Sequence, residues 1–456
     1  MPEVDRLAAF ASGATYDALP AEVVAALSLH VLDAIACALG ALGKGPTIAV
    51  RRFTDLLGGA PSCALVGGGR TAPDRAAFYN GALVRYLDFN DAFLAPGETC
   101  HPSDSFAAVL AACETAGTGG KDLLAALAVA YQVQCRLSEA APVRRRGFDH
   151  TVQLAYGAAA GCARALRLTP AQTAAAVSIA GTALNALRVT RTGRLSHWKG
   201  LAAPHAAAGA LAAALLAREG ITGPAELFEG NKGFREALAG PFSIEWEKEG
   251  LSAVLATSLK RYDAEIHSQS CIEALLWLRA ERSLRAEDLD AIEVDVFDVA
   301  FQIIGGGEEG EKTHVRTRED ADHSLPYLLA VALLDGRVGP QQFAPARIAA
   351  ADVQTLLSKI RIRPDAALSR RFPAEMPCRL IAVLADGQRL VREQADYEGF
   401  RSRPMGWDAV VGKLRRLAGI ALDERDLDRL VRLVERLPQA NPAELSGLLA
   451  RAKTQE

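Results

Sequence analysis

Apolar residues recur three and four positions apart through most of the first half of the chain. This spacing places them on one face of a helix and predicts a largely helical region from about residue 20 to 255. The predicted helices span residues 21–42, 104–117, 121–139, 153–168, 170–187 and 201–218. Small residues recur on their apolar faces, as in YGAAAGCARAL, and small side chains let helix axes approach closely.

The pattern changes after about residue 262. Residues 291–297 and 359–363 alternate apolar and polar positions, which is the period of a half-buried strand. Residues 379–384 and 388–393 flank an Ala-Asp-Gly turn and are expected to form a β-hairpin. Helices are predicted at residues 268–282, 318–335 and 346–358, and helical periodicity returns from residue 406.

These elements predict a mostly helical protein with two domains. A large all-helical domain would combine both ends of the chain, residues 1–262 and 400–456. A smaller α/β domain, residues 263–399, would be inserted before the C-terminal helices.

Charge and hydropathy exclude several classes of partner. The 456 residues carry 51 Lys and Arg against 54 Asp and Glu, without a long basic run, so we expect no nucleic-acid partner. The most apolar windows are short and interrupted, so we expect no membrane partner. The first residues lack the basic and apolar regions of a signal peptide, which favours a cytoplasmic protein.

The eight cysteines predict neither a disulfide framework nor a metal cluster. None forms a CxxC pair, so free thiols in a reducing compartment are expected, with no structural zinc and no iron–sulfur cluster. The two runs of three glycines lack the spacing of a phosphate-binding loop, which argues against a nucleotide. We therefore expect no metal and no cofactor.

The densest polar cluster of the first half contains Asp88, Asp91 and His101. Asp88 ends a helix-like stretch, and His101 follows 13 residues later, immediately before the next predicted helix. These residues either form part of a functional site or serve only as loop and capping residues, because Asp and Ser also favour caps and turns without any chemistry.

Cations gather in the segment RVTRTGRLSHWKG, where Arg188, Arg191, Arg194 and Lys199 fall within twelve residues. The segment is either a solvated loop or a pocket for a multiply charged carboxylate, which Arg and Lys bind well.

Further polar segments carry three more histidines. GFDH contains His150, KRYDAEIHSQ contains Lys260 and His267, and ADHSLPY contains His323 and Tyr327. By contrast, His30 and His205 lie inside apolar helical runs and are expected to be core or interface residues.

Together these segments resemble the MmgE/PrpD family, which includes 2-methylcitrate dehydratase, cis-aconitate decarboxylase and iminodisuccinate epimerase. The matching motifs are LDFNDAFLAPGETCHPSD, GFDHT, RTGRLSHWKG, KRYDAEIHSQ, ADHSLPY and RPMGW, in family order across residues 80–407. The resemblance implies a homodimer whose subunits each have a helical domain and a smaller lid domain with the site between them, and it implies no iron–sulfur cluster. The residues that it places in the site are Asp88, Asp91, His101, His150, Lys199, Lys260 and Tyr327.

Two positions depart from the decarboxylase branch of the family. There a Thr follows the second Asp of the first motif, and a His lies five residues after the KRY-type lysine. Here these positions hold Ala92 and Glu265, and the segment EIHSQ resembles the dehydratase form EFHAQ. The resemblance therefore favours dehydration over decarboxylation.

Loss of water from a hydroxy-tricarboxylate needs a base, an acid and cations. Lys199 and Lys260 are expected to hold carboxylates, helped by Arg191 and His267, and His323 is a further binding candidate. The proton-transfer candidates are His101 and His150, while Asp88 would either orient His101 or act as the base itself. Tyr327 is a candidate donor to the leaving oxygen, and Asp91 is a further candidate for substrate binding. The sequence does not assign base and acid among the first three.

The expected activity is thus a cofactor-independent lyase that converts a small polycarboxylate such as 2-methylcitrate to 2-methyl-cis-aconitate. Decarboxylation of cis-aconitate or epimerisation of an amino-dicarboxylate on the same fold stays open. A non-catalytic metabolite-binding protein is the alternative of another class, although a binder has no need of paired proton-transfer groups.

Overall fold

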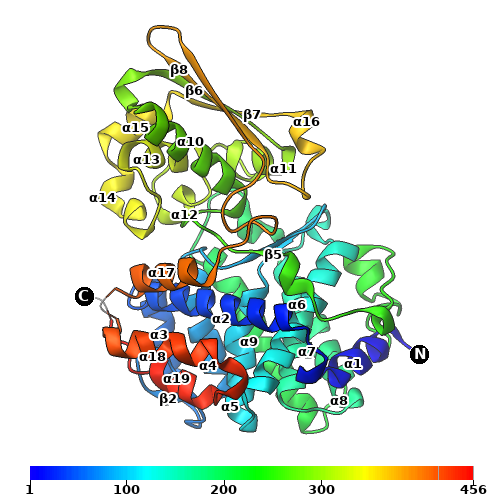
Figure 1. Cartoon of the computed structure of the whole chain (residues 1–456). Helices are drawn as coiled ribbons and strands as arrows, with labels where there is room; N and C mark the ends of the chain where they lie inside the picture. Colours follow the sequence, from blue (N-terminus) through cyan, green and yellow to red (C-terminus); the bar gives the residue numbers. More distant parts are fainter. Residues whose placement is uncertain (420, 455–456) are drawn as a thin grey trace. The chain divides into compact units, whose positions relative to one another are not determined.

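The computed structural model describes residues 1–419 and 421–454, and contacts divide the chain into two compact units (Figure 1). The helical unit comprises residues 1–190, 200–258 and 406–456. The mixed unit comprises residues 259–405 together with 191–199, a segment that the sequence did not assign to it. Each unit is described by itself below.

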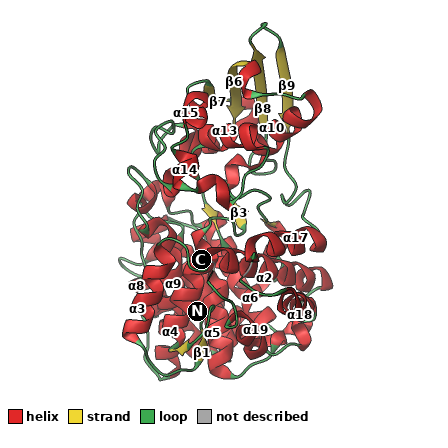
Figure 2. Ribbon diagram, turned by 90° about the vertical axis from the view of Figure 1, so that its left-hand side faces the viewer, coloured by secondary structure: helices red, strands yellow, loops and turns green. Residues whose placement is uncertain are grey.

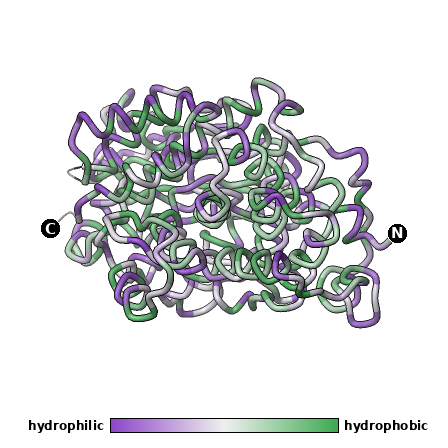
Figure 3. Tube along the Cα trace, turned by 90° about the horizontal axis from the view of Figure 1, so that it is seen from below, coloured by the Kyte–Doolittle hydropathy of each residue, from purple (hydrophilic) through white to green (hydrophobic). Residues whose placement is uncertain are grey.

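The helical unit confirms the prediction of a mostly helical protein. Its helices are α1 (Glu3–Gly13), α2 (Ala21–Ala41), α3 (Pro46–Leu57), α4 (Pro73–Tyr86), α5 (Phe106–Ala116), α6 (Gly120–Ala140), α7 (Thr151–Ala165), α8 (Pro170–Ala183), α9 (Trp198–Arg218, whose first two residues group with the mixed unit), α17 (Trp407–Ala418), α18 (Glu424–Glu435) and α19 (Pro442–Leu449). All six helices predicted in the first half are present, with ends that differ by a few residues. Hydrophobic and hydrophilic residues are interspersed along the coiled segments of the hydropathy-coloured trace (Figure 3).

Small residues bring α6 and α7 close together, as the sequence predicted. A Cβ added at Gly157 of α7 would lie 2.6 Å from the main-chain oxygen of Ala130 in α6. One at Gly161, one turn later, would lie 2.9 Å from the oxygen of Ala126. Only glycine fits such backbone contacts, so these two positions fix the α6–α7 packing that carries His150, the residue before α7.

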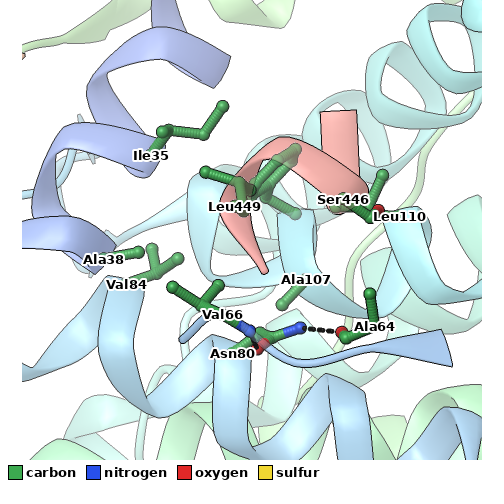
Figure 4. Close-up of a pocket in the computed structure, with 11 residues that line it drawn as sticks. Ile35, Ala38, Ala64, Val66, Asn80, Val84, Ala107, Leu110, Ser446 and Leu449 are labelled. Carbon is green, nitrogen blue, oxygen red and sulfur yellow. Dashed lines mark hydrogen bonds between the residues drawn. The ribbon is translucent and has the colours of Figure 1, made fainter. Parts of the chain in front are cut away.

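The C-terminal helices complete the helical unit. Helix α17 lies beside α2 in both ribbon views (Figures 1 and 2). Between α2, α4, α5 and α19 lies a small cavity of about 10 Å³, lined by apolar side chains together with Asn80 and Ser446 (Figure 4). Asn80 donates to the carbonyl of Ala64 and accepts from the amide of Val66, so its polar atoms are satisfied at the cavity wall.

Short strands accompany these helices. Strands β1 (Cys63–Ala64) and β2 (Arg70–Thr71) pair with each other, while β3 (Ala92–Leu94) lies between β4 (Thr99–Cys100) and β5 (Thr257–Ser258). In the β3–β4 hairpin Phe93 pairs with Cys100. The hairpin therefore brings Asp91, the residue before β3, next to His101, the residue after β4.

The mixed unit contains a four-stranded sheet in the order β7-β6-β8-β9. Its strands are β6 (Leu289–Val296), β7 (Ile360–Pro364), β8 (Cys378–Leu384) and β9 (Arg389–Gln394). Strands β6 and β7 are parallel, whereas β8 is antiparallel to both of its neighbours. The predicted strands and the β8–β9 hairpin are confirmed, and Gly387 takes the positive φ of 85° that the turn requires.

Helices α10 (Gln269–Arg282) and α13 (Leu325–Asp335) pack against the sheet. The shorter helices of the unit are α11 (Asp298–Ala300), α12 (Arg318–Ala321), α14 (Pro345–Ile348), α15 (Ala351–Leu357) and α16 (Ala366–Ser369). On β6 the apolar side chains of Ile292 and Val294 are buried, whereas Glu293 alternates with them and pairs with Arg363 and Arg389.

The prediction of one helix over residues 318–335 was wrong. The helix is broken at residues 322–324, because Ser324 caps a new helix: its Oγ accepts from the amide of Tyr327 at 3.1 Å. Pro326 in the first turn favours such a start. The predicted helix 346–358 is likewise broken, into α14 and α15. The first break places Asp322 and His323 between two helices.

The expectation that every apolar window is too short to span a membrane was also wrong. Ala21–Ala41 and Trp198–Arg218 are long and apolar enough by length and composition. Most of the first helix is buried, and core helices pass the same test. His205, expected in the core or at an interface, is exposed on α9, and all eight cysteines are buried thiols outside any disulfide.

Candidate active site

Asp88 occupies a strained position at the end of α4. Its φ is 52°, a left-handed conformation that non-glycine residues rarely adopt and that is frequent at functional sites. Its amide donates to the carbonyl of Arg85 at 3.0 Å, and its carboxylate accepts from the Arg85 guanidinium. Arg85 also contacts Asn90 and Asp104. The buried guanidinium therefore holds the Asp88 carboxylate in place.

Asp91 is fully buried and its carboxylate is enclosed by donors. Oδ2 lies 2.8 Å from Nδ1 of His30 and 2.7 Å from the hydroxyl of Tyr131, and Oδ1 accepts from both the amide and the hydroxyl of Ser103. Burial raises the pKa of Asp91, but the hydrogen bond and the charge of His30, together with Ser103 and Tyr131, outweigh it, so the net pKa is lowered. The carboxylate stays charged and anchors the loop.

The hydrogen on His101 is fixed by the main chain of Asp91. Nδ1 of His101 lies 2.6 Å from the carbonyl oxygen of Asp91. A carbonyl oxygen only accepts, so Nδ1 carries the hydrogen and Nε2 is the nitrogen that gains or loses a proton.

The ring of His150 packs against the ring of His101. The two rings lie 5.3 Å apart between centroids and are tilted by 73°, in an edge contact. Nδ1 of His150 lies 3.2 Å from Oδ1 of Asp149, a fully buried carboxylate that also accepts from the amide of Thr151. Asp88 is linked to Asp91 indirectly, through hydrogen bonds of Arg85, Asn90 and Ser103. Asp88, Asp91, His101 and His150, all buried in the helical unit, are here called the imidazole cluster.

The mixed unit has a cluster of its own, centred on Lys199. Nζ of Lys199 donates to Oδ1 of Asp322 at 2.6 Å and lies 2.8 Å from Nδ1 of His323. All three side chains are buried. The helix break described above places Asp322 and His323 at Lys199, although more than 120 residues separate them along the chain.

Glu265 and His267 form a second pair in the mixed unit. Oε1 of Glu265 lies 2.6 Å from Nδ1 of His267, and Oε2 accepts from the main-chain amide of the same residue at 2.7 Å. Burial raises the pKa of Glu265. The charge and hydrogen bond of His267, followed by the charges of His323 and Lys260, lower it by more, so the net pKa is below the usual value. Through the interactions of Glu265 with His323 and Lys260, these residues form one group. The group is here called the lysine cluster, and its members are Lys199, Lys260, Glu265, His267, Asp322 and His323.

The other predicted residues also lie in the mixed unit. Lys260 is fully buried, and Arg191 is buried in the 191–199 segment. Tyr327 is buried too, and its hydroxyl donates to the main-chain carbonyl of Gln342. This bond gives Tyr327 a structural contact within the unit, and its role in the reaction stays a prediction.

Sequence reasoning missed several partners of these residues. Asp322 and Asp149 each lie beside a predicted histidine in a motif, so adjacency was an available signal. Arg85 lies three residues before Asp88, so proximity in the sequence was a signal for it too. His30 was expected to be a core or interface residue, and it is buried. No local signal indicated its contact with Asp91, which lies 61 residues later in the chain.

Paired buried imidazoles, a strained buried carboxylate in the same unit and a buried lysine group are typical of an enzyme that moves protons on an anionic substrate. Comparison with known families agrees. The MmgE/PrpD N-terminal domain matches residues 5–247, and the MmgE/PrpD C-terminal domain matches residues 262–439. The chain therefore belongs to the MmgE/PrpD family, and the resemblance found in the sequence is confirmed.

Similar proteins include several dehydratases. A 2-methylcitrate dehydratase from Cupriavidus necator is 29% identical over 424 residues, which cover 86% of this chain and 82% of the relative. An alkylcitrate dehydratase from a fungal species is 28% identical over 447 residues, 88% of this chain and 85% of the relative. A 2-methylcitrate dehydratase from Escherichia coli K12 is 29% identical over 320 residues, 66% and 64% of the two chains. These relatives support the prediction that the chain is an enzyme.

Proposed function

We propose that this enzyme removes water from a hydroxy-tricarboxylate such as 2-methylcitrate and releases 2-methyl-cis-aconitate. The observation that carries the proposal is the contact of His101 with His150 at 5.3 Å, because two adjacent imidazoles can serve a reaction with two proton transfers. The dehydratases among the relatives support the same substrate class.

The reaction proceeds by loss of a proton and a hydroxyl from neighbouring carbons. A base takes the proton beside a carboxylate, the electrons of that C–H bond form the double bond, and the hydroxyl leaves with a proton from an acid. Asp88, His101 and His150 are the proton-transfer groups of the imidazole cluster, and Tyr327 is a further candidate donor. Asp91 anchors His101.

The cations serve the carboxylates of the same substrate. Lys199 and Lys260 neutralise them, with Arg191, His267 and His323 as additional binding groups. Without neutralisation, the charge that builds on the carboxylate next to the departing proton would make the transition state unfavourable. No metal is required by this chemistry, because the side chains supply both proton transfer and charge neutralisation.

Three further properties belong to the proposal. The enzyme acts as a homodimer with the mixed unit as a lid, it works in the cytoplasm in propionate metabolism, and it needs no cofactor. Exposed apolar side chains on α3 support a subunit contact in the helical unit, among them Ile48, Phe53 and Leu56.

The direct test is an ultraviolet assay on 2-methylcitrate, citrate and cis-aconitate, with the products identified by NMR. Dehydration produces a conjugated alkene acid from the first two substrates. Release of carbon dioxide from cis-aconitate would instead identify a decarboxylase, and the presence of Ala92 and Glu265 at the two branch-specific positions argues against this outcome. Binding without any turnover would identify a metabolite-binding protein.

A further inference from the structure

We propose that Glu265 and His267 form a proton-transfer pair, in which Nε2 of His267 takes the proton from the substrate carbon and Glu265 positions the ring. This inference rests on the proposed dehydration and changes the role of His267 from a carboxylate holder to a catalytic base. Glu265 acts through His267 and is a positioning residue.

The carboxylate of Glu265 fixes the orientation of the His267 ring. Each carboxylate oxygen makes one contact: Oε2 with the main-chain amide at 2.7 Å and Oε1 with Nδ1 at 2.6 Å. An ionised carboxylate only accepts, so Nδ1 carries a hydrogen and the lone pair of the neutral ring is on Nε2. This is the arrangement by which a carboxylate holds an imidazole in one tautomer and stabilises the imidazolium that forms when the ring takes a proton.

Nε2 of His267 differs from Nδ1 in its contacts. This atom is buried, and it has no hydrogen-bond partner among residues 1–419 and 421–454. Buried polar atoms are nearly always paired, and an exception calls for a functional explanation. The rings of Phe297 and Phe372 lie 5.6 and 5.8 Å from the imidazole, so apolar walls flank the ring.

Other titratable side chains lie near Glu265 and His267. Lys260 and His323 both lower the pKa of Glu265, so they lie within electrostatic reach of it in the same unit. The ammonium of Lys260 attracts a substrate carboxylate, and the carbon next to that carboxylate is the one that loses its proton. The base and the charge that stabilises its product therefore belong to one cluster.

Nε2 of His267 forms a bond to the proton, and the electron pair of the C–H bond becomes the second bond of the alkene. The C–O bond breaks with its electron pair on oxygen, which receives a proton from an acid that is later reprotonated by solvent, and leaves as water. The imidazolium of His267, stabilised by Glu265, then returns its proton to solvent.

The test is His267→Asn, measured with the ultraviolet assay. The side-chain nitrogen of Asn can replace Nδ1 as the donor to Glu265, so the fold is kept while Nε2 is lost. We expect kcat to fall by at least about 100-fold with KM changed by less than about threefold. His314→Asn is the matched control, because His314 forms an exposed pair with Glu311 at 2.8 Å and should keep wild-type kinetics.

Variants of Glu265 test its positioning role. Glu265→Gln should lower kcat without raising KM, and Glu265→Asp, which keeps the carboxylate, should recover part of the loss. A His267→Asn enzyme with raised KM and unchanged kcat, or with wild-type kinetics, overturns the pair alone. A wild-type enzyme that forms no alkene from any hydroxy-tricarboxylate overturns the proposed function, and the pair with it.

Discussion

Lys413 and Asp33 form an ion pair in which both side chains are buried, with Nζ 2.7 Å from Oδ1. Lys413 also donates to the main-chain oxygen of Phe89 at 2.7 Å and lies 3.6 Å from the centre of the Phe89 ring. Helix α17, from the C-terminal end of the chain, thus binds the loop between Asp88 and Asp91. The conformation of the imidazole cluster depends on a contact between segments more than 300 residues apart.

Removal of this lysine should destabilise the helical unit. Lys413→Met leaves Asp33 buried without its partner, and breaking a buried ion pair costs about 3–5 kcal/mol. Urea unfolding should show this loss, and the double variant Lys413→Met with Asp33→Asn should recover part of it, because no uncompensated charge remains. Lys248→Met removes an exposed ion pair with Glu245 and should change stability little. Equal effects of the two Met variants would contradict the buried pair.

The α6–α7 contact makes a separate prediction. Gly157→Ala places a methyl group 2.6 Å from a main-chain oxygen, which cannot move aside as a side chain could. We expect a loss of about 1–3 kcal/mol in the free energy of unfolding, as for other overpacked sites. Gly447 in α19 has no atom within 4 Å of its added Cβ, so Gly447→Ala should stabilise by about 0.5–1 kcal/mol. A stable Gly157→Ala variant would show that the helices are less closely packed than described.

The fold was largely predictable because its main signals are local. Helices α2, α6 and α10 and the β8–β9 hairpin each follow from periodicity or a turn within one segment. The break at residues 322–324 was missed although Ser324 and Pro326 carry the signal for it, because the apolar period continues across the break. The β3–β4 hairpin was missed because its strands of two and three residues are too short for a period.

The site was predictable only as a set of residue types. Motifs indicated His101, His150 and Lys199, but not which group fixes each one. The tautomer of His101 is set by a main-chain oxygen, which no sequence pattern reports. Contacts such as His30 with Asp91 depend on the packing of helix α2 against a loop distant in sequence, and an apolar helical context gives no sign of them.

Glu98 predicts a pH dependence of stability. Its Oε2 accepts from the amides of Val143 and Arg144, and burial, opposed by Arg188, raises its pKa from 4.5 to about 7. The folded state therefore holds the proton more tightly than the unfolded state. The resulting stability is fully present below about pH 4.5 and is lost as the pH rises to about 7, by on the order of 3 kcal/mol.

The matching variant is Glu98→Gln, which keeps an oxygen acceptor but does not titrate. Its Tm should decrease less than that of the wild type between pH 5 and 7.5, since other groups titrate equally in both proteins. Parallel pH profiles of Tm would contradict the raised pKa.

His101 should be required for turnover but not for folding. In His101→Asn the side-chain amide can still donate to the carbonyl of Asp91, as Nδ1 does, while Nε2 is lost. We expect kcat/KM on 2-methylcitrate to fall by at least about 100-fold, with an unchanged circular dichroism spectrum and Tm. Turnover within a few-fold of the wild type would remove His101 from the proton-transfer groups.

The central claim is that side chains alone dehydrate a polycarboxylate, with Lys199 neutralising its charge. The most direct measurement is turnover of 2-methylcitrate by enzyme dialysed against a chelator, for the wild type and for Lys199→Ala. The account predicts full wild-type activity after chelation and a loss of at least about 100-fold in kcat/KM for the variant. Activity that disappears with the chelator and returns with a metal ion, or a fully active Lys199→Ala enzyme, would contradict it.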